Sequence, residues 1–232
     1  MPLNRLIGMV KKLNHSLTSK AYWGIRNRLR NIKTSINSVF FNWTFSTKGC
    51  CVHSDCEVYG LHAIEIGKNF KARAGLWLHA VISYEDQLFK PKIFIGNNVA
   101  ASKNLHIAAI NSISIHDNVL IGSNVLITDH NHGIYDAAIK SVLPSEPSEA
   151  PSSRKLSGQS IVIESNVFLG DGCIILPGSH IGTGSVLGAG TVVSGYIANA
   201  SIAAGAPAKI IKNFDPNSAS WKRKKPDRNQ SN

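Results

Sequence analysis

The sequence predicts an all-β fold in which short strands stack into a parallel β-helix, with an α-helical arm before it and a loop that protrudes from it. Three observations predict this fold: a six-residue repeat of aliphatic residues, the loss of that repeat over one long segment, and a basic, amphipathic N-terminus. The 232 residues suit one all-β domain. With 43% hydrophobic and 17% charged residues, the chain can form a core and is not disordered as a whole.

From residue 163 onward an aliphatic residue returns at every sixth position, with a small or β-branched residue four positions later. The aliphatic positions are Ile163, Leu169, Ile175, Ile181, Leu187 and Val193, and the offset positions are Val167, Cys173, Ser179, Ser185 and Thr191. A helix or one long strand has a different period, whereas a short strand followed by a turn fits this spacing. Three such units close a triangular coil, with glycine or asparagine at the strained turns, and stacked coils form ladders of inward aliphatic side chains.

The same spacing runs through three upstream stretches. These are Ile115, Ile121 and Ile127; Ile95, Ala101 and Ile107; and, more weakly, Ile66, Ala72 and Leu78. Between Ile113 and Ile115 the phase slips by two residues. We interpret the repeated aliphatic residues as core, because such side chains are mostly buried in folded proteins.

Several of the repeated units match a known family. The units "IEIGKN", "IFIGNN", "VFLGDG", "SHIGTG" and "SVLGAG", with the ending "IAAGAPAKIIK", resemble the hexapeptide-repeat acyltransferases, in particular the galactoside, maltose and polysaccharide O-acetyltransferases. The resemblance runs from Ile64 to Lys212 and implies a left-handed parallel β-helix, a homotrimer, and acetyl transfer from acetyl-CoA in a groove between subunits. The handedness rests on the resemblance alone, because ordinary crossover connections are right-handed.

The repeat stops after Ile127 and returns at Ile161, so residues 128–160 are predicted to leave the column as a loop. A loop of this length on a rigid column is either disordered or functional. In the resembling enzymes a histidine at the root of such a loop is the catalytic base. The matching residue in "TDHN" is His130, with Asn131 where the family motif has proline. A positioned imidazole, with an ordinary pKa of about 6.5, can take the proton of a sugar hydroxyl as that hydroxyl attacks a thioester.

Two alternatives for His130 stay open: a solvated loop residue without a role, and a metal ligand. His132 stands beside it in the sequence, and His106 and His116 precede it by one coil. A shared metal site would therefore depend on how the coils and subunits bring these rings together. The O-acetyltransferase interpretation itself expects no metal.

The resemblance also implies a coenzyme A site in the C-terminal coils. The residues expected to contact the cofactor are Phe168, Gly188, Ala189, Ser194, Lys209 and Lys212. Gly188 and Ala189 leave a face without bulk for the pantetheine arm, and Phe168 stands where a tryptophan often borders the cofactor. Lys209 stands where a cation meets phosphate. Gly195 replaces a lysine of the galactoside enzymes, so that contact is either missing or supplied by Lys212 or the tail.

The acceptor contacts are less sharply indicated. The residues predicted to contact the acceptor are Ser102, Asn104, Asp129 and His132. Ser102 aligns with a substrate-binding asparagine of the galactoside enzymes, and Asn104 points to the same side of a strand two residues later. Trp77 and His79 either border the same groove or pack against the column.

Both ends of the chain are basic and account for most of the formal net charge of +11. No acidic residue precedes Asp55. Aliphatic residues recur at helical spacing in two runs: Leu3, Leu6, Val10, Leu13 and Leu17, and, after a break near Gly24, Ile25, Leu29, Ile32, Ile36 and Val39. We expect residues 1–45 to form a basic helical arm, 46–212 the β-helix domain and 213–232 a basic tail.

This charge has three interpretations. The arm either caps the column, with its charge on the solvated side, or lies on anionic lipid. Nucleic acid is not expected, because no recognised nucleic-acid-binding module accompanies the charge.

The remaining features bound the compartment. Four cysteines (Cys50, Cys51, Cys56 and Cys173) lack the spacing of a zinc module or a disulfide framework, which favours a reducing compartment. Basic residues interrupt any signal-peptide core, and no stretch approaches the roughly 18 apolar residues that span a bilayer. We therefore expect a cytoplasmic protein, either soluble or peripheral at the inner face of the plasma membrane.

Together these observations predict an acetyl-CoA-dependent O-acetyltransferase. Its acceptor would be a sugar hydroxyl of a surface polysaccharide, such as O-antigen or capsule, or of a precursor. The alternatives are an N-acyltransferase on an amino sugar and a non-catalytic β-helix scaffold.

Overall fold

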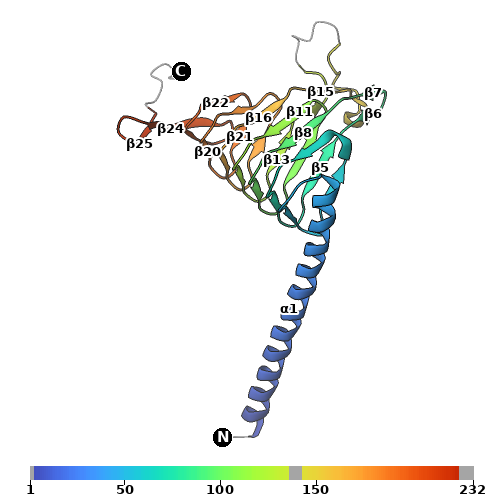
Figure 1. The fold of residues 1–232 in the computed structure, drawn as a ribbon, viewed down its shortest axis with the longest axis vertical. Coiled ribbons are helices and arrows are strands. Elements are labelled where there is room, and N and C mark those ends of the chain that lie inside the picture. The colour runs from blue at the N-terminus through green and yellow to red at the C-terminus, as the bar shows by residue number, and fades with distance from the viewer. Residues whose placement is uncertain (1–2, 136–142, 225–232) are drawn as a thin grey trace.

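The computed structural model describes residues 3–135 and 143–224, with side chains from Lys20 onward. One helix, α1 (Leu3–Thr44), leads into a column of short strands, and the last described segments form antiparallel strands at the far end of that column (Figure 1).

Three parallel sheets form the three faces of the column. Sheet A contains β1 (Cys51–Val52), β4 (Lys71–Ala72), β9 (Ala100–Ala101), β12 (Leu120–Ile121), β17 (Phe168–Leu169), β20 (Val186–Leu187) and β23 (Ser201–Ala204). Sheet B contains β2 (Glu57–Tyr59), β5 (Trp77–Ala80), β10 (His106–Ala109), β13 (Leu126–Thr128), β18 (Ile174–Ile175) and β21 (Val192–Val193). Sheet C contains β3 (Ile64–Ile66), β8 (Lys92–Ile95), β11 (Ser112–Ile115), β16 (Ile161–Ile163), β19 (His180–Ile181) and β22 (Tyr196–Ile197). The chain visits sheets A, B and C in turn, so each circuit is one coil, as the repeat predicts.

The predicted aliphatic ladders form the core. On sheet B the register places Leu78, Ile107, Ile127, Ile175 and Val193 one above the other, and all five are buried. The phase slip also has a structural explanation, because residues 113 and 115 lie in the same strand, β11, and both face inward. Each coil is therefore stabilised mainly by the coils on either side of it.

Asparagines occupy left-handed corners between the sheets, as expected. Asn69, Asn98 and Asn118 have φ angles of 60°, 56° and 59°. Their side chains form a ladder, since the amide of Asn69 donates to Asn98 at 2.9 Å and that of Asn98 donates to Asn118 at 3.1 Å. Asparagine tolerates this backbone conformation, and its stacked amides satisfy one another along the edge of the column.

Two excursions leave the column at the corner between sheets B and C. The shorter is the hairpin β6 (Ser83–Tyr84) and β7 (Gln87–Leu88), and the longer contains β14 (His130–His132), a 3-10 turn (Pro151–Ser153) and β15 (Leu156–Gly158). A second 3-10 turn (Leu61–Ala63) precedes sheet C in the first coil.

The root of the longer excursion is an ordered antiparallel pair, where the sequence predicts a loop. His130 pairs with Gly158, and His132 pairs with Leu156. Pro144, Pro147 and Pro151 lie farther out along the excursion, so they leave this pair intact. Residues 136–142 of the predicted loop lie outside the described residues.

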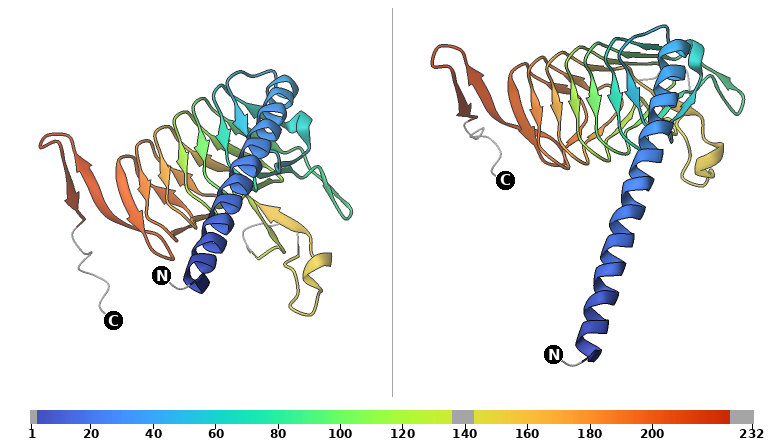
Figure 2. Two further views of the ribbon diagram at one scale, coloured as in Figure 1. Left: turned by 90° about the horizontal axis from the view of Figure 1, so that it is seen from below. Right: turned by 60° about the horizontal axis from the view of Figure 1, so that its bottom comes forward.

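Helix α1 is continuous through Gly24, where the sequence predicts a break. A single glycine costs a helix only about 1 kcal/mol relative to alanine, which the neighbouring turns can absorb. The C-terminal end of α1 contacts the column, and the rest projects away from it, as Figure 1 and the right view of Figure 2 show. No described helix is apolar over a length that could cross a membrane.

The contacts at the end of α1 are mainly polar. The Asn37 side chain donates to the carbonyls of Val52 and His53, and Asn42 exchanges two hydrogen bonds of 3.0 Å with the backbone of Cys50. Phe41 is the main apolar anchor, with its ring 6.1 Å from that of Phe70. The helix thus caps the first coil with one short patch near its end.

The predicted basic tail begins as regular structure. β24 (Lys209–Asp215) turns back antiparallel on β23, and β25 (Ser220–Arg223) pairs with β24, so sheet A continues past the last coil. Phe214 and Trp221 contact each other across this pair, with ring centroids 5.4 Å apart. Residues 225–232 of the tail lie outside the described residues.

Candidate active site

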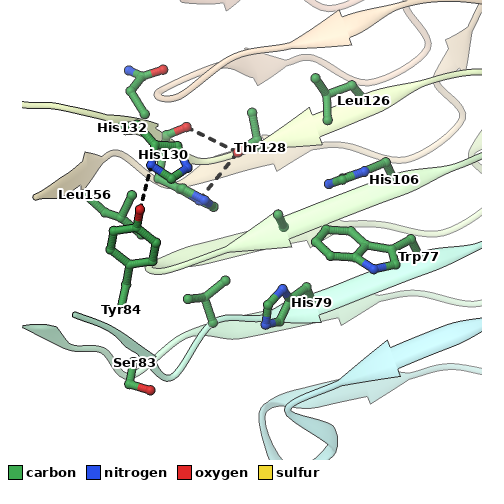
Figure 3. A pocket seen from close by; sticks show the side chains of 13 residues that line it. Trp77, His79, Ser83, Tyr84, His106, Leu126, Thr128, His130, His132 and Leu156 are labelled. Carbon is green, nitrogen blue, oxygen red and sulfur yellow. Dashed lines mark hydrogen bonds between the residues drawn. The ribbon is translucent and has the colours of Figure 1, made fainter. Parts of the chain in front are cut away.

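A cavity of about 520 Å³ lies on the outer face of sheet B, beside its corner with sheet C (Figure 3). Strands β5, β10 and β13 form its floor, and the two excursions form its wall. Its lining includes Trp77, His79, His106, Thr128 and His130 from the coils and the root of the loop. The site therefore lies where the hexapeptide period is interrupted.

His130 is held by a buried carboxylate. Its Nδ1 lies 3.0 Å from Oδ1 of Asp129, and its side chain is 11% exposed while that of Asp129 is 0% exposed. The carboxylate also accepts the backbone N–H groups of Ile110 and Asn111, each at 2.8 Å. Because an ionised carboxylate only accepts hydrogen bonds, Nδ1 carries the proton and the free ring nitrogen, Nε2, is the basic one.

Asp129, which the sequence analysis assigns to the acceptor, is fully buried and does not line the cavity. Side chains alternate along an extended chain, and here Asp129 turns inward while Thr128 and His130 line the cavity. Its role in this geometry is to orient the imidazole. The sequence gives one signal of this, an aspartate directly before the histidine at the point where the repeat ends.

Gly158 allows this arrangement on the paired strand. A side chain at this position would overlap the carbonyl oxygen of Asp129 and approach Cα of His130 at 2.7 Å. The neighbouring Gln159 N–H donates to the same Asp129 carbonyl at 2.8 Å. The backbone of β15 thus packs directly against the segment that carries the histidine.

His132 lies in the wall of the same cavity. Its Nδ1 is 3.2 Å from the hydroxyl of Tyr84, which donates to the carbonyl of Ser152 at 2.5 Å. Figure 3 shows Tyr84 reaching from the shorter excursion toward His132. The ring of His132 is exposed, as an acceptor contact requires.

Three rings lie along the floor of the cavity. The centroid of Trp77 is 3.9 Å from that of His106 and 5.0 Å from that of His79. Burial lowers the pKa of both histidines, and the charge of His130 lowers them further; His79 also lowers that of His106. Both are therefore neutral at pH 7 and present a ring nitrogen beside an aromatic surface.

Ser102 and Asn104 lie outside this cavity. Both lie on the turn between β9 and β10, and Asn104 has a left-handed φ of 57° and donates from its amide to Asn124 at 2.8 Å. Asn104 is thus a corner asparagine of the column. Within one chain, the structure does not bring either residue to His130.

The expected cofactor residues lie at several places around the C-terminal coils. Gly188 and Ala189 directly follow β20 at the corner between sheets A and B, and Ser194 follows β21 at the corner between sheets B and C. Ser194 also lines a second cavity of about 450 Å³ together with Asn131 and Gln159. This second cavity reaches from the C-terminal coils to the strand that bears His130.

Phe168, Lys209 and Lys212 lie on sheet A instead. Phe168 faces outward from β17 and is 40% exposed, while the two lysines lie on β24. Within one chain these residues are on a different face from His130.

The described histidines are not grouped for a metal. His116 follows β11 and lies against Phe94 on sheet C, away from the cavity. Among the described residues, no three histidine, cysteine or acidic side chains are placed to hold a metal ion. All four cysteines are free.

The shorter excursion is the part of the site that sequence reasoning missed. Gln87 exchanges two hydrogen bonds with the backbone of Leu156, at 3.1 and 2.6 Å, and Leu156 packs with Val81 and Ile110. These contacts brace the long excursion at its root. The available signal was the loss of the period between Leu78 and Ile95.

Comparison with known proteins identifies the family. The family described as bacterial transferase hexapeptide (six repeats) matches residues 160–195. WbbJ of Escherichia coli (strain K12), whose name provisionally assigns it as a lipopolysaccharide biosynthesis O-acetyl transferase, is 38% identical over 168 residues, covering 72% of this chain and 81% of the relative. The galactoside O-acetyltransferase of the same strain is 32% identical over 123 residues, covering 53% of this chain and 55% of that enzyme.

A solved structure supports the fold. It is an N-acyltransferase from Bacillus cereus in complex with dTDP and 3-hydroxybutyryl-CoA, with a TM-score of 0.59 at 17% identity over 78% of this chain and 90% of that one. The column is a left-handed parallel β-helix. The chain belongs to the hexapeptide-repeat acyltransferase family.

Proposed function

We propose that the protein transfers an acetyl group from acetyl-CoA to a sugar hydroxyl of a surface polysaccharide or of its precursor. The observation that carries the proposal is His130, held by Asp129 with its basic nitrogen available to a cavity on the outer face of sheet B. The similarity to WbbJ and to a galactoside O-acetyltransferase supports the reaction and the class of acceptor.

In this proposal His130 is the general base. Its Nε2 takes the proton of the acceptor hydroxyl while the hydroxyl oxygen attacks the carbonyl carbon of the thioester. The tetrahedral intermediate collapses with breakage of the carbon–sulfur bond, and the imidazolium returns the proton to the thiolate. The products are the acetyl ester and the free thiol of CoA, with no acetyl group on the protein.

The acceptor occupies the cavity beside Trp77. An indole face suits the apolar face of a sugar ring, while the neutral rings of His79 and His106 suit its hydroxyl groups. His132 and Tyr84 contact the acceptor from the wall. Ser102 and Asn104 are not retained as acceptor contacts, since neither lines this cavity.

The donor approaches from the C-terminal coils. Gly188 and Ala189 lie at the corner between sheets A and B, Ser194 follows β21, and the second cavity connects Ser194 with Asn131, next to the base. The pantetheine arm follows this route and delivers its thioester to His130.

A homotrimer completes the donor site. Phe168, Lys209 and Lys212 lie on sheet A, so they contact the cofactor bound along sheet B of a neighbouring subunit. A cyclic trimer provides this arrangement, because its interfaces bring two different faces of the same chain together. Residues 46–212 form the acyltransferase domain in this proposal, and the enzyme works in the cytoplasm, peripheral to the membrane.

Binding to CoA tests the proposal against a non-catalytic scaffold. The full-length protein should be retained on immobilised CoA and should release free thiol from acetyl-CoA when a saccharide acceptor is added. Light scattering should give about three times the chain mass of 25.1 kDa. Failure to bind CoA would support the scaffold, and thiol release with amino sugars but not with hydroxyl acceptors would support N-acyl transfer.

A further inference from the structure

Helix α1 carries an exposed apolar stripe that no part of its own chain covers within the described residues. The members of this stripe are each more than half exposed: Tyr22, Ile25, Leu29, Ile32, Ile36, Val39 and Trp43. Its members are spaced alternately three and four residues apart, so they form one continuous line along the helix.

The stripe faces away from the column. The face of α1 that contacts the first coil carries Asn37, Ser38, Phe41 and Asn42, on a different side of the helix. A helix that served only to cap the column would turn its apolar side chains inward. Here mainly polar groups bond to the column, and the apolar residues meet solvent.

Cations border the stripe. Arg26, Arg30 and Lys33 recur at spacings of four and three residues, so they lie along one edge, and Arg28 lies on the other. A groove of about 450 Å³ runs along this edge, with Arg26, Arg30 and Lys33 beside Ile25 and Leu29, and Ser54 of the first coil closes one end of it. The 42 residues of α1 contain no acidic residue.

This charge pattern argues against pairing with the same helix of a second copy. In a coiled coil the residues that flank the apolar line meet across the interface, and they stabilise the pair when their charges are opposite. Here Arg26, Arg28 and Lys33 hold those flanking positions. Two parallel copies would therefore place like charges against one another.

We propose that the stripe of α1 is a docking surface for an anionic lipid bilayer. The apolar side chains enter the boundary between headgroups and acyl chains, while the flanking arginines and lysine reach the lipid phosphates. Tyr22 and Trp43 suit this position, because their rings combine an apolar body with a polar atom. The proposal goes beyond acetyl transfer and does not depend on it.

Vesicle sedimentation of the full-length protein tests the surface. We expect the protein to sediment with vesicles of phosphatidylglycerol and phosphatidylcholine at low salt, to be released at high salt, and not to sediment with phosphatidylcholine alone. No sedimentation with the anionic vesicles at low salt would overturn the proposal.

Two matched pairs of variants locate the contact. Lys33→Glu should weaken vesicle partitioning on the order of 10-fold, whereas Lys20→Glu makes the same change of charge on the far side of the helix and should have a much smaller effect. Ile32→Ser should also weaken vesicle partitioning on the order of 10-fold, because it removes an aliphatic side chain that enters the bilayer in this proposal. Leu88→Ser removes an exposed aliphatic residue on the shorter excursion and should have no effect.

Acetyl transfer to a soluble acceptor and the mass in solution are measured on the same variants. Unchanged turnover with weakened vesicle binding would support the docking surface, whatever the outcome for the proposed reaction. Equal effects within either pair would overturn it, because binding would then follow net charge or general hydrophobicity. Loss of the oligomer in Ile32→Ser with normal vesicle binding would assign the stripe to a contact between copies, which also overturns it.

Discussion

The carboxylate of Asp129 lies 3.0 Å from Nδ1 of His130 and is fully buried, while His130 itself reaches the cavity. Two residues that are adjacent in the sequence thus point in opposite directions. One holds the proton on Nδ1, and the other presents Nε2 to a substrate. This division of roles gives the first two predictions.

Replacement of His130 by alanine should lower turnover by about 100-fold or more, the usual contribution of a general base. Affinity for acetyl-CoA and the mass of the oligomer should not change, because the side chain belongs to the chemical step. Steady-state kinetics and equilibrium binding measure both effects. His116→Ala, outside the cavity, is the control and should keep full activity; near-normal turnover of His130→Ala would remove His130 from the mechanism.

Asp129→Asn should lower kcat by up to about 100-fold, the lower end of what a general base contributes, with little change in the KM of either substrate. An amide can donate to Nδ1 and stabilise the wrong tautomer, so the ring is less often poised to take a proton. The pH profile of kcat should also shift, which a purely structural residue would not cause. A stably folded variant with the wild-type profile would contradict the positioning role.

Gly158→Ala tests the close packing behind His130. The added methyl group would overlap the Asp129 carbonyl oxygen, so the segment bearing His130 must move. We expect a fall in kcat on the order of 100-fold, since small misplacements of catalytic groups have effects of that size. Gly24→Ala is the matched control, because its methyl group would meet nothing within 4 Å. Equal activity of both variants would show that the root of the loop adapts freely.

Trp77→Ala should raise the KM for the saccharide on the order of 10-fold, or about 1.4 kcal/mol of lost binding. Binding of acetyl-CoA should stay the same, because Trp77 lies in the N-terminal coils, away from Ser194 and Ala189. Initial-rate measurements with each substrate varied in turn separate the two constants. Trp43→Ala, on the exposed stripe of α1, is the control, and a change confined to acetyl-CoA binding would move the acceptor elsewhere.

Glu164 links the stability of the column to pH. Hydrogen bonds from Thr183 and from His180, at 2.7 Å, lower the pKa of Glu164 to about 2. A lowered carboxyl pKa stabilises the fold above its unfolded value of about 4.3, and this contribution is lost as the pH falls toward 2. The unfolding temperature of the wild type should thus fall more steeply between pH 5 and 2 than that of Glu164→Gln. Parallel curves for the two proteins would contradict the prediction.

The sequence alone determined the column and the point at which its repeat is interrupted. The six-residue spacing predicts which side chains point inward, so residues such as Ile127 and Ile175 were predictable as members of the core. The interruption of the repeat after Ile127 indicated His130 as a candidate functional residue. The prediction of a break near Gly24 was wrong. One glycine destabilises a helix only slightly, and the helical pattern of the residues on both sides outweighs it.

Only the tertiary structure decided which way the side chains around the base point and what braces them. The burial of Asp129 depends on the backbone N–H groups of Ile110 and Asn111, which lie one coil away. The hairpin that carries Tyr84 and Gln87 meets the long excursion only because both leave the column at the same corner. These are contacts between residues distant in sequence, set by the stacking of coils, and no local pattern of residues encodes them.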